Sequence, residues 1–389
     1  MEILFVSHKY PPATGGMEKQ SHELINQMGE LTKVHRIVYE GKESRLRFFA
    51  LLGKRIRKVL KNNPSINIIH YNDGLLGVVG MIQRRHPKVK KTVTIHGLDV
   101  VFPGLIYQKL IVPKFNDFDL IFAVSHATAA ACRIRGIKEE KLVVVNNGVD
   151  ILTKPQTTKA EAEHLLFQKY RVAVAGKKIL VALGRPVKRK GFSWFIKNVM
   201  PLLHKDFILL LIGPVQQEND RLGILLKFLP AFISTRIELF LGYPSDERAL
   251  SALLNPNTSR VLRLGKLPDA DIDAILAIAE AFVMPNIEVQ GDMEGFGLVC
   301  LEACMHGTKV FASASGGITD AIIHKKNGVL LPPGHITSWV HALNDLAENP
   351  AAHLSASEIL SFTESRFGWQ KMAKGYHLHF SRLIATIGA

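Results

Sequence analysis

The sequence of 389 residues contains few cysteines, only Cys132, Cys300 and Cys304. So small and odd a number excludes a disulfide framework and favours a reducing compartment. Cys300 and Cys304 are four residues apart on one face of an expected helix, a spacing that can also serve a metal ion. No second Cys/His pair has the spacing of a zinc finger, so we interpret both as buried apolar side chains and predict no metal site.

Long apolar runs are also missing. The longest uninterrupted stretches, such as Phe207–Pro214, are far shorter than the ~18–20 residues that span a bilayer. The N-terminus, Met1-Glu2 followed by a short apolar run, lacks the basic and long apolar regions of a signal peptide. We therefore expect a cytoplasmic protein that is either soluble or peripheral on the inner face of the plasma membrane.

Acidic residues are in deficit, with 34 Asp and Glu against 49 Lys and Arg and a formal net charge of +15. This surplus indicates an anionic partner, which can be nucleic acid, a membrane surface or a phosphorylated ligand. The content of apolar residues (47%) and charged residues (21%) is ordinary and excludes a disordered or fibrous chain. The length suits two domains of ~100–200 residues each.

Short β-branched or Leu-rich runs alternate with helical patterns along the chain, which predicts an α/β fold with parallel sheets and helices on both faces. The alternation stops between residues 150 and 178. We therefore predict two Rossmann-like domains, 1–170 and 171–366, with a ligand-binding cleft between them, and a last helix in 367–389 that crosses back to the first domain. The predicted strands are Ile3–Val6, Val34–Val38, Ile66–His70, Thr92–Ile95, Leu120–Val124, Leu142–Val145, Ile179–Leu183, Ile208–Ile212, Ile237–Leu241, Arg260–Leu264, Ala281–Met284, Lys309–Ala312 and Val329–Leu331. The predicted helices include Met17–Met28, Leu46–Lys61, His126–Arg135, Lys159–Tyr170 and Trp369–Ile387.

Two glycine-containing segments follow predicted strands. After the first strand, Gly15 and Gly16 open a helix whose free N–H groups suit an anion, although a tight strand–helix turn is an equally simple explanation. After the first strand of the second domain, the segment Gly184–Gly191 carries four cations within six residues. Because Arg offers a fork and Lys a point charge to phosphate oxygens, this segment indicates a phosphate site, with a solvated basic loop as the alternative.

A third segment, residues 288–303, follows the predicted strand Ala281–Met284 and carries two carboxylates. Glu294 stands before a glycine-flanked helix start, and Glu302 comes eight residues later. On a helix, this separation is about two turns and places both on one face, about 12 Å apart along the axis. One carboxylate can then meet a sugar ring and the other a ribose, whereas an acid at a helix N-terminus plus a solvated Glu is the alternative.

Taken in order, these segments resemble the retaining glycosyltransferases of family 4, which belong to the glycosyl transferases group 1 and have the GT-B fold of two facing Rossmann-like domains. The resemblance covers the chain nearly end to end. It rests on Pro11 to Glu18, His96-Gly97, Ser125, Asn147-Gly148-Val149-Asp150, Gly184-Arg185, Lys190-Gly191, the Glu294-x7-Glu302 pair with its Glu-Gly-Phe-Gly opening, Gly316-Gly317 and Asn327-Gly328.

The resemblance implies a role for each matched residue in the second domain. Arg185 and Lys190 would hold the donor diphosphate and stabilise the leaving nucleoside diphosphate, so that neither a metal nor a cofactor is required. Glu294 would contact the transferred sugar and Glu302 the ribose. The residues whose backbone would approach the sugar and the phosphates are Phe296, Gly297 and Leu298.

In the first domain, the resemblance implies that Gly16 lets the chain approach the diphosphate and that His96 lies by the sugar and the acceptor. A buried structural histidine is the alternative for His96. The donor would be a UDP- or GDP-sugar, and Gly213-Pro214-Val215, which departs from the commoner Gly-x-Gly-Pro, leaves the base open. The acceptor would be a glycan or a lipid-linked envelope molecule.

Two thirds of the surplus charge lies in residues 1–150, which hold 23 Lys and Arg against 13 Asp and Glu. The expected helix Leu46–Lys61 has an apolar side and an opposite basic side, and a second basic run is Arg84–Lys91. The helix either packs on the sheet with a solvated basic face or docks on an anionic membrane. We expect no nucleic-acid partner, because no stacking aromatics or base-reading motif accompany the charge. The basic side consists of Arg47, Lys54, Arg57, Lys58 and Lys61.

Three classes of function therefore compete. The first is a hexosyl-type glycosyltransferase. The second is another GT-B enzyme, either a nucleotide-sugar 2-epimerase or a phosphorylase. The Gly-Arg…Lys-Gly segment together with the Glu-x7-Glu pair argues against the epimerase. The short chain, which has no evident pyridoxal-phosphate lysine motif, argues against the phosphorylase. The third is a non-catalytic basic module that binds membranes or nucleic acid, which leaves Arg185, Lys190, Glu294 and Glu302 unexplained.

Overall fold

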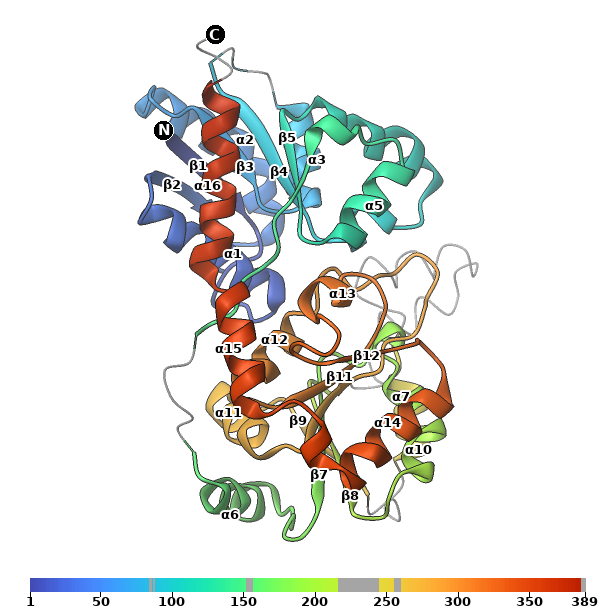
Figure 1. Ribbon diagram of the computed structural model, residues 1–389. Coiled ribbons are helices and arrows are strands. Elements are labelled where there is room, and N and C mark those ends of the chain that lie inside the picture. Colours follow the sequence, from blue (N-terminus) through green and yellow to red (C-terminus); the bar gives the residue numbers. More distant parts are fainter. Residues whose placement is uncertain (84–85, 87, 152–156, 216–244, 255–259, 386–389) are drawn as a thin grey trace. The chain divides into compact units, whose positions relative to one another are not determined.

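The computed structural model describes residues 1–83, 86, 88–151, 157–215, 245–254 and 260–385 (Figure 1). The chain forms two compact units. The first comprises Met1–Val149 and Phe367–Ala389, and the second comprises Asp150–Arg366. Within these described ranges, each unit contains a six-stranded sheet whose strand pairs are all parallel.

The first sheet has the strand order β2-β1-β3-β4-β5-β6. All six strands predicted for residues 1–150 are confirmed, with ends that differ by at most two residues. The elements are β1 (Glu2–Ser7), α1 (Gly16–Gly29), β2 (Lys33–Val38), α2 (Arg45–Asn62), β3 (Ile68–Tyr71), α3 (Gly74–Ile82), β4 (Lys90–Ile95), α4 (Leu98–Val101), η1 (Tyr107–Ile111), η2 (Val112–Asp117), β5 (Leu120–Ala123), α5 (His126–Ile134), η3 (Glu139–Lys141), β6 (Leu142–Val144) and α16 (Trp369–Ala385).

Helix α16 belongs to the first unit although it comes last in the chain, and it runs beside α1 (Figure 1). Its aromatic side chains pack on the sheet: the ring of Tyr376 stacks on Phe122 with centroids 4.2 Å apart. The Tyr376 hydroxyl also lies 2.9 Å from Thr94 Oγ1. Beneath it, His70 is fully buried between two threonines, and burial lowers its pKa to about 3. This neutral histidine is therefore a core residue.

The second sheet has the strand order β12-β11-β10-β7-β8-β9. The predicted strands of this half are confirmed except Ile237–Leu241, which lies outside the described residues. The elements are α6 (Lys159–Tyr170), β7 (Lys178–Leu183), η4 (Lys188–Lys190), α7 (Phe192–Asn198), η5 (Met200–Leu202), β8 (Phe207–Ile212), α10 (Glu247–Leu253), β9 (Val261–Gly265), α11 (Asp269–Ile278), β10 (Ala281–Met284), α12 (Leu298–Met305), β11 (Lys309–Ser313), α13 (Ile318–Ala321), β12 (Val329–Leu331), α14 (Ile336–Glu348), η6 (Pro350–Ala352) and α15 (Ala356–Arg366).

Helices cover both faces of this sheet (Figure 1). Along β7, Ile179 and Val181 face a core shared with α6, α11, α12 and α15, whereas Leu180 and Ala182 face a core shared with α7, α10 and α14. This alternation follows from the period of two in a strand, and burial on both faces explains the continuous apolar sequence of β7 and β8.

The predicted boundary at residue 170 is wrong for α6. This helix belongs to the second unit, because Leu166 lies in the core that also holds Ile275 of α11. The Asp271 carboxylate of α11 accepts hydrogen bonds from Lys169 and Tyr170 at the end of α6. A largely polar helix between two sheets carries little sequence information about which of them it joins.

Cysteines Cys132, Cys300 and Cys304 are all buried and free. The Sγ atom of Cys300 lies 3.0 Å from the sulfur of Met284, and that of Cys304 lies 3.1 Å from the carbonyl of Asn327. Within the described ranges, no group of His, Cys, Asp and Glu side chains is arranged to hold a metal ion. The two thiols of α12 are part of the apolar core, as the sequence suggested.

Candidate functional site

The second sheet reverses its strand order between β7 and β10, which are neighbours although β8 and β9 lie between them in sequence. In open parallel sheets, ligands bind beyond the carboxyl ends of the strands at such a reversal. The predicted cations Arg185 and Lys190 follow β7, and Glu294 follows β10. The structure therefore brings these residues to the same edge of the sheet.

The loops after β7 and β10 are held together by their backbones. The Ile287 N–H donates to the carbonyl of Arg189 at 2.9 Å. Gly191 has a φ of 65°, and a Cβ placed on it would lie 2.0 Å from the carbonyl oxygen of Pro285. Only glycine allows this approach, so the Lys-Gly pair of the sequence motif fixes the position of Lys190 relative to the loop that carries Glu294.

Glu294 lies at the centre of a cluster of charges. Its Oε2 is 3.1 Å from Nζ of Lys190, also accepts a hydrogen bond from the Arg189 guanidinium, and lies 3.4 Å from the amide nitrogen of Asn286. Burial would raise the pKa of Glu294, but Arg189 and Lys190 outweigh it and lower the pKa to about 2. Glu294 is therefore a carboxylate at neutral pH.

The two predicted phosphate ligands differ in their surroundings. Lys190 is 7% exposed and paired with Glu294, whereas Arg185 is exposed and has no ion-pair partner in the part of the chain that the structure describes. An exposed guanidinium at the carboxyl end of a strand is available to bind an incoming anion.

The loop that carries Glu294 rests on a second glycine pair. The N–H of Gly317 donates to the carbonyl of Glu294 at 2.8 Å, and a Cβ on Gly317 would lie 1.9 Å from the carbonyl of Gly295. Gly297 then caps α12, which begins at Leu298. Close packing of the Glu294–Gly295 backbone therefore explains why glycines stand at positions 316 and 317.

The helical geometry expected for the two glutamates is wrong. Glu294 lies in the loop before α12, so the separation of two helical turns does not describe its position relative to Glu302, which is on the helix and half-buried. Phe296 is 3% exposed and Gly297 is buried, so the phenyl ring is not a group that a ligand can reach.

Arg189 is the main residue of this site to which the sequence assigned no role. Its Nε lies 3.1 Å from Asp292 Oδ1, its other end contacts Glu294, and its side chain is only 16% exposed. Burial would lower the pKa of Arg189, but the two carboxylates raise it. In the sequence, Arg189 is one of three consecutive cations, Lys188–Lys190. Such a run does not show which of its side chains points inward.

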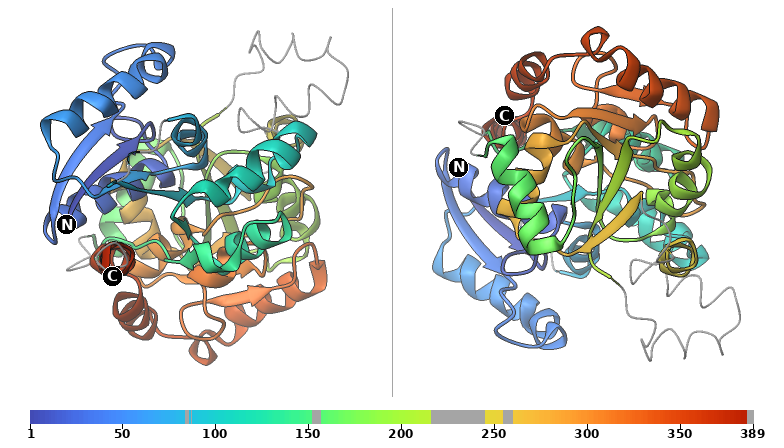
Figure 2. Two further views of the ribbon diagram at one scale, coloured as in Figure 1. Left: turned by 90° about the horizontal axis from the view of Figure 1, so that it is seen from above. Right: turned by 90° about the horizontal axis from the view of Figure 1, so that it is seen from below.

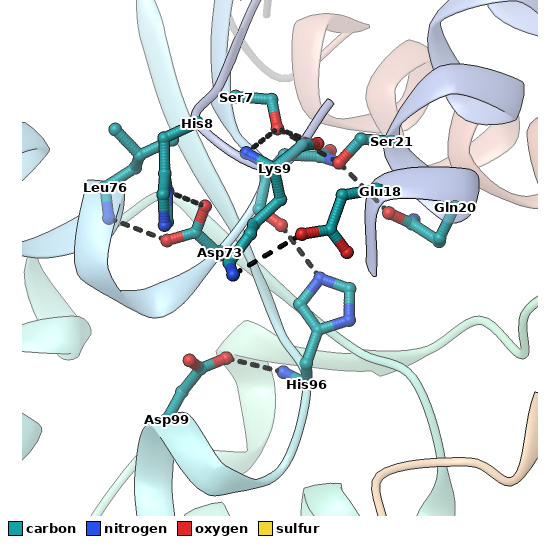
Figure 3. Close-up of polar contacts among 11 residues, drawn as sticks. Ser7, His8, Lys9, Glu18, Gln20, Ser21, Asp73, Leu76, His96 and Asp99 are labelled. Atoms are coloured by element: carbon teal, nitrogen blue, oxygen red, sulfur yellow. Dashed lines mark hydrogen bonds and ion pairs between the residues drawn. The ribbon is translucent and has the colours of Figure 1, made fainter. Parts of the chain in front are cut away.

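The first sheet has its own reversal, between β1 and β3. The residues at these two carboxyl ends, together with His96 after β4, form a connected polar network (Figure 3). The side chain of Asn72, after β3, donates to Gln20 at 3.0 Å and contacts Ser21 of α1. The ring of His96 donates from Nε2 to the carbonyl of Asn72 at 2.8 Å.

His96 is partly exposed and its position is fixed at two points. Besides the bond to Asn72, its own backbone N–H donates to Asp99 Oδ2 at 2.7 Å. Burial raises the pKa of Asp99, and the nearby His96 lowers it by a smaller amount. Gly16 is the exposed first residue of α1, and two residues later Glu18 lies 3.4 Å from the ammonium of Lys9.

Two sequence profiles match the chain in tandem. The profile described as Glycosyltransferase Family 4 matches residues 4–151, and the profile of Glycosyl transferases group 1 matches residues 167–359. The chain belongs to the group 1 glycosyltransferases.

Two relatives with glycosyltransferase names agree with this membership. A GDP-mannose-dependent alpha-(1-6)-phosphatidylinositol monomannoside mannosyltransferase of Mycolicibacterium smegmatis is 22% identical over 97% of both chains. A D-inositol 3-phosphate glycosyltransferase of Pseudarthrobacter chlorophenolicus is 30% identical, but the match spans only 33% of this chain and 30% of that relative.

Among solved structures, Anabaena HepE in complex with UDP-glucose has a TM-score of 0.72 at 21% identity and covers 98% of this chain and 100% of its own. Sucrose-phosphate synthase of Thermosynechococcus elongatus has a TM-score of 0.72 at 20% identity, with 99% of both chains covered. The predicted GT-B fold of two Rossmann-like units is thus confirmed. Because the chain belongs to a family of glycosyltransferases, the alternative of a non-catalytic binding module is rejected.

Replacing Arg189 by Met should expose the role of this arginine through the pH dependence of the glycosyltransferase. Glu294 would keep only Lys190 as a cation, and the burial that raises its pKa would remain. Activity that requires the carboxylate is lost as the pH falls through its pKa. The unmodified enzyme, in which the pKa of Glu294 is about 2, should therefore show no acid limb from this group above pH 4, whereas kcat/KM of the variant should show one. The measurement is the pH–rate profile between pH 4 and 8.

Two controls accompany this variant. Arg189→Lys keeps the charge and should move the limb less. Arg133→Met removes an arginine from an exposed pair with Glu139 and should leave the profile unchanged. An acid limb of Arg189→Met that coincides with that of the unmodified enzyme would show that Arg189 does not control Glu294.

Proposed function

We propose that the protein is a retaining, metal-independent hexosyltransferase that moves a sugar from a UDP- or GDP-sugar to a glycan or a lipid-linked envelope acceptor. The observation that carries the proposal is the pairing of Lys190 with an ionised Glu294 at the reversal of the second sheet, next to the exposed Arg185. The cations match the negative diphosphate of the donor. The carboxylate matches the sugar, which gains positive charge as its bond to the diphosphate breaks.

The proposed division of labour is electrostatic. Arg185 and Lys190 bind the diphosphate and stabilise the negative charge that grows on it as the bond to the sugar breaks. Glu294 stabilises the sugar, and Glu302 holds the ribose. The backbone at residues 296–298 lies against the sugar and phosphates, and Gly16 and His96 contribute from the first unit.

The relatives indicate which donors and acceptors to try first. The Mycolicibacterium relative depends on GDP-mannose and acts on a phosphatidylinositol mannoside, whereas the HepE structure holds UDP-glucose. We therefore keep both bases in the proposal and give priority to acceptors that carry hydroxyl groups on a lipid anchor.

A thermal-shift screen with UDP-, GDP-, ADP- and dTDP-sugars tests the proposal. A donor at ~100 times its Kd adds about 2.7 kcal/mol, so one base should raise the melting temperature by about 3–6 °C. The same donor should then be hydrolysed or transferred with its anomeric configuration retained, and EDTA should not change the rate. Absence of any shift, or an inverted product, would refute the proposal.

We also propose that α2 docks the enzyme on an anionic membrane. Figure 2 shows this helix along the periphery of the first unit. Phe48, Leu52 and Ile56 are buried, and the opposite side carries exposed cations without ion-pair partners in the described ranges. Of the predicted basic side, Arg47 alone has such a partner, Glu43 at 3.8 Å. No described helix is long and apolar enough to cross a bilayer. The unpaired cations are Lys54, Arg57, Lys58 and Lys61.

Replacing these four cations by Gln should weaken binding to vesicles of 30% phosphatidylserine at least tenfold, because each cation near the surface contributes about 1 kcal/mol. Sedimentation at low and high salt measures the effect. The matched control removes four exposed lysines of the second unit and should bind as the unmodified protein does. Equal loss in both variants would show that net charge alone, and not α2, attracts the lipid. The control residues are Lys177, Lys197, Lys205 and Lys326.

A further inference from the structure

The reversal of the first sheet holds a buried pair of residues that the proposed function does not use. His8 follows β1 and Asp73 follows β3, and these are the two strands between which the order reverses. The pair therefore stands where parallel sheets bind ligands, at the corresponding place to Lys190 and Glu294 in the second sheet.

The two side chains are in contact with each other and buried. His8 Nδ1 lies 2.9 Å from Asp73 Oδ2, and the side chains are 8% and 2% exposed. Neither of these two atoms has another partner among the described residues. The other carboxylate oxygen of Asp73 accepts the N–H of Leu76 at 2.9 Å and caps α3 (Figure 3).

This arrangement determines which nitrogen of His8 carries the proton. Burial would raise the pKa of Asp73, but the contact with His8, the Leu76 N–H and the nearby His96 lower it. An ionised carboxylate only accepts hydrogen bonds, so of the two neutral tautomers of the ring this contact selects the one with its proton on Nδ1. In that tautomer the opposite nitrogen, Nε2, carries a lone pair, and no hydrogen bond to it is present in the described part of the chain.

Stability alone is a weak explanation for this pair. Burying a carboxylate next to an imidazole costs desolvation that the contact only partly repays, and Asp73 could cap α3 without His8. The ring is further oriented by Phe49 of α2, whose centroid is 5.5 Å away. A buried imidazole that is held on one nitrogen and unpartnered on the other is arranged to accept a hydrogen bond from a ligand.

The surrounding charges indicate the class of ligand. The same network carries the carboxylates of Asp73, Asp99 and Glu18, and Glu18 is paired with Lys9. Near these carboxylates, a ligand that donates a hydrogen bond from a neutral hydroxyl group to Nε2 is favoured, and an anionic ligand is disfavoured.

We propose that Nε2 of His8, oriented by Asp73, accepts a hydrogen bond from a hydroxyl group of the acceptor and forms a polyol-binding subsite in the first unit. The inference rests on the proposed glycosyl transfer and names a part of its acceptor site. No proton is transferred in this step.

Asn and Gln separate the two nitrogens of the ring. In His8→Asn the amide nitrogen replaces Nδ1 and keeps the contact with Asp73, but the acceptor at Nε2 is lost. In His8→Gln the amide reaches the position of Nε2 and can restore an acceptor there. A merely structural role predicts that His8→Asn behaves as the unmodified protein, whereas a binding role predicts the opposite.

The probes are methyl α-mannoside and myo-inositol, two neutral polyols, each titrated to 100 mM and followed by saturation-transfer NMR. We expect the unmodified enzyme to bind at least one of them, His8→Asn to bind it about tenfold more weakly, and His8→Gln to recover part of the loss. Absence of binding to the unmodified enzyme, or equal binding by His8→Asn, would overturn the subsite.

Two further readouts complete the test. Nitrogen-15 spectra of the histidines should show His8 with its proton on Nδ1, and Asp73→Asn, which still caps α3, should change this tautomer. A proton on Nε2 in the unmodified enzyme would overturn the proposed orientation. Thermal shifts with UDP and GDP should be the same in His8→Asn and the unmodified enzyme, so a failure of nucleotide binding in both would count against the proposed function and not against this subsite.

Discussion

Replacing Lys190 by Met should lower kcat/KM for the nucleotide sugar by about 10²–10³-fold and leave the fold intact. A buried ammonium that faces the negative charge developing in the transition state typically accelerates the reaction by about this factor. The side chains have similar length, and Glu294 would keep the contact with Arg189, so no carboxylate is left without a cation. Steady-state kinetics and the melting temperature of the variant measure both parts of the prediction.

The control for this variant is Lys188→Met. Lys188 lies two residues away in the same basic run but is exposed, so its loss removes the same charge without touching Glu294. Its kcat/KM should stay within about twofold of normal, as for most exposed charges. Near-normal turnover of Lys190→Met, or an equal loss in Lys188→Met, would contradict the assignment.

Replacing Glu294 by Gln should lower kcat by about 10²–10³-fold with little change in the KM of the donor. The amide has the same shape but no charge, so it loses the interaction that strengthens as the sugar becomes positive in the transition state. Arg189 would remain paired with Asp292, which keeps the loop in place. The expected split between kcat and KM distinguishes a transition-state role from simple donor binding.

Asp292→Asn is the matched control for this second variant. Asp292 faces the same arginine at 3.1 Å, but no contact with the sugar is proposed for it. Its effect on kcat should be less than about tenfold, because it acts only through Arg189. A loss in Asp292→Asn as large as that in Glu294→Gln would show that both carboxylates merely support the loop.

The elements of both sheets could be predicted because their strands are buried on two faces. Runs such as Phe207–Ile212 are apolar throughout, and this pattern leaves few alternatives in a chain where helical segments intervene. The unit to which α6 belongs was not predictable in the same way. Its membership depends on Leu166 and on contacts with α11, which is about 100 residues away in the sequence.

In the site, too, some features could be predicted from the sequence and others could not. The order of motifs placed Arg185, Lys190 and Glu294 correctly at one edge of the second sheet, because each follows a strand. The inward turn of Arg189 and the pairing of His8 with Asp73 depend on contacts between distant segments. Asp73 also has the ordinary appearance of a helix cap, which conceals its second contact.

The most direct test of the central claim is the comparison of nucleoside diphosphates with monophosphates by calorimetry. If Arg185 and Lys190 hold the diphosphate of the donor, UDP or GDP should bind at least tenfold more tightly than the corresponding monophosphate, and Lys190→Met should abolish most of this difference. Equal affinities of di- and monophosphate for the unmodified protein would contradict the account.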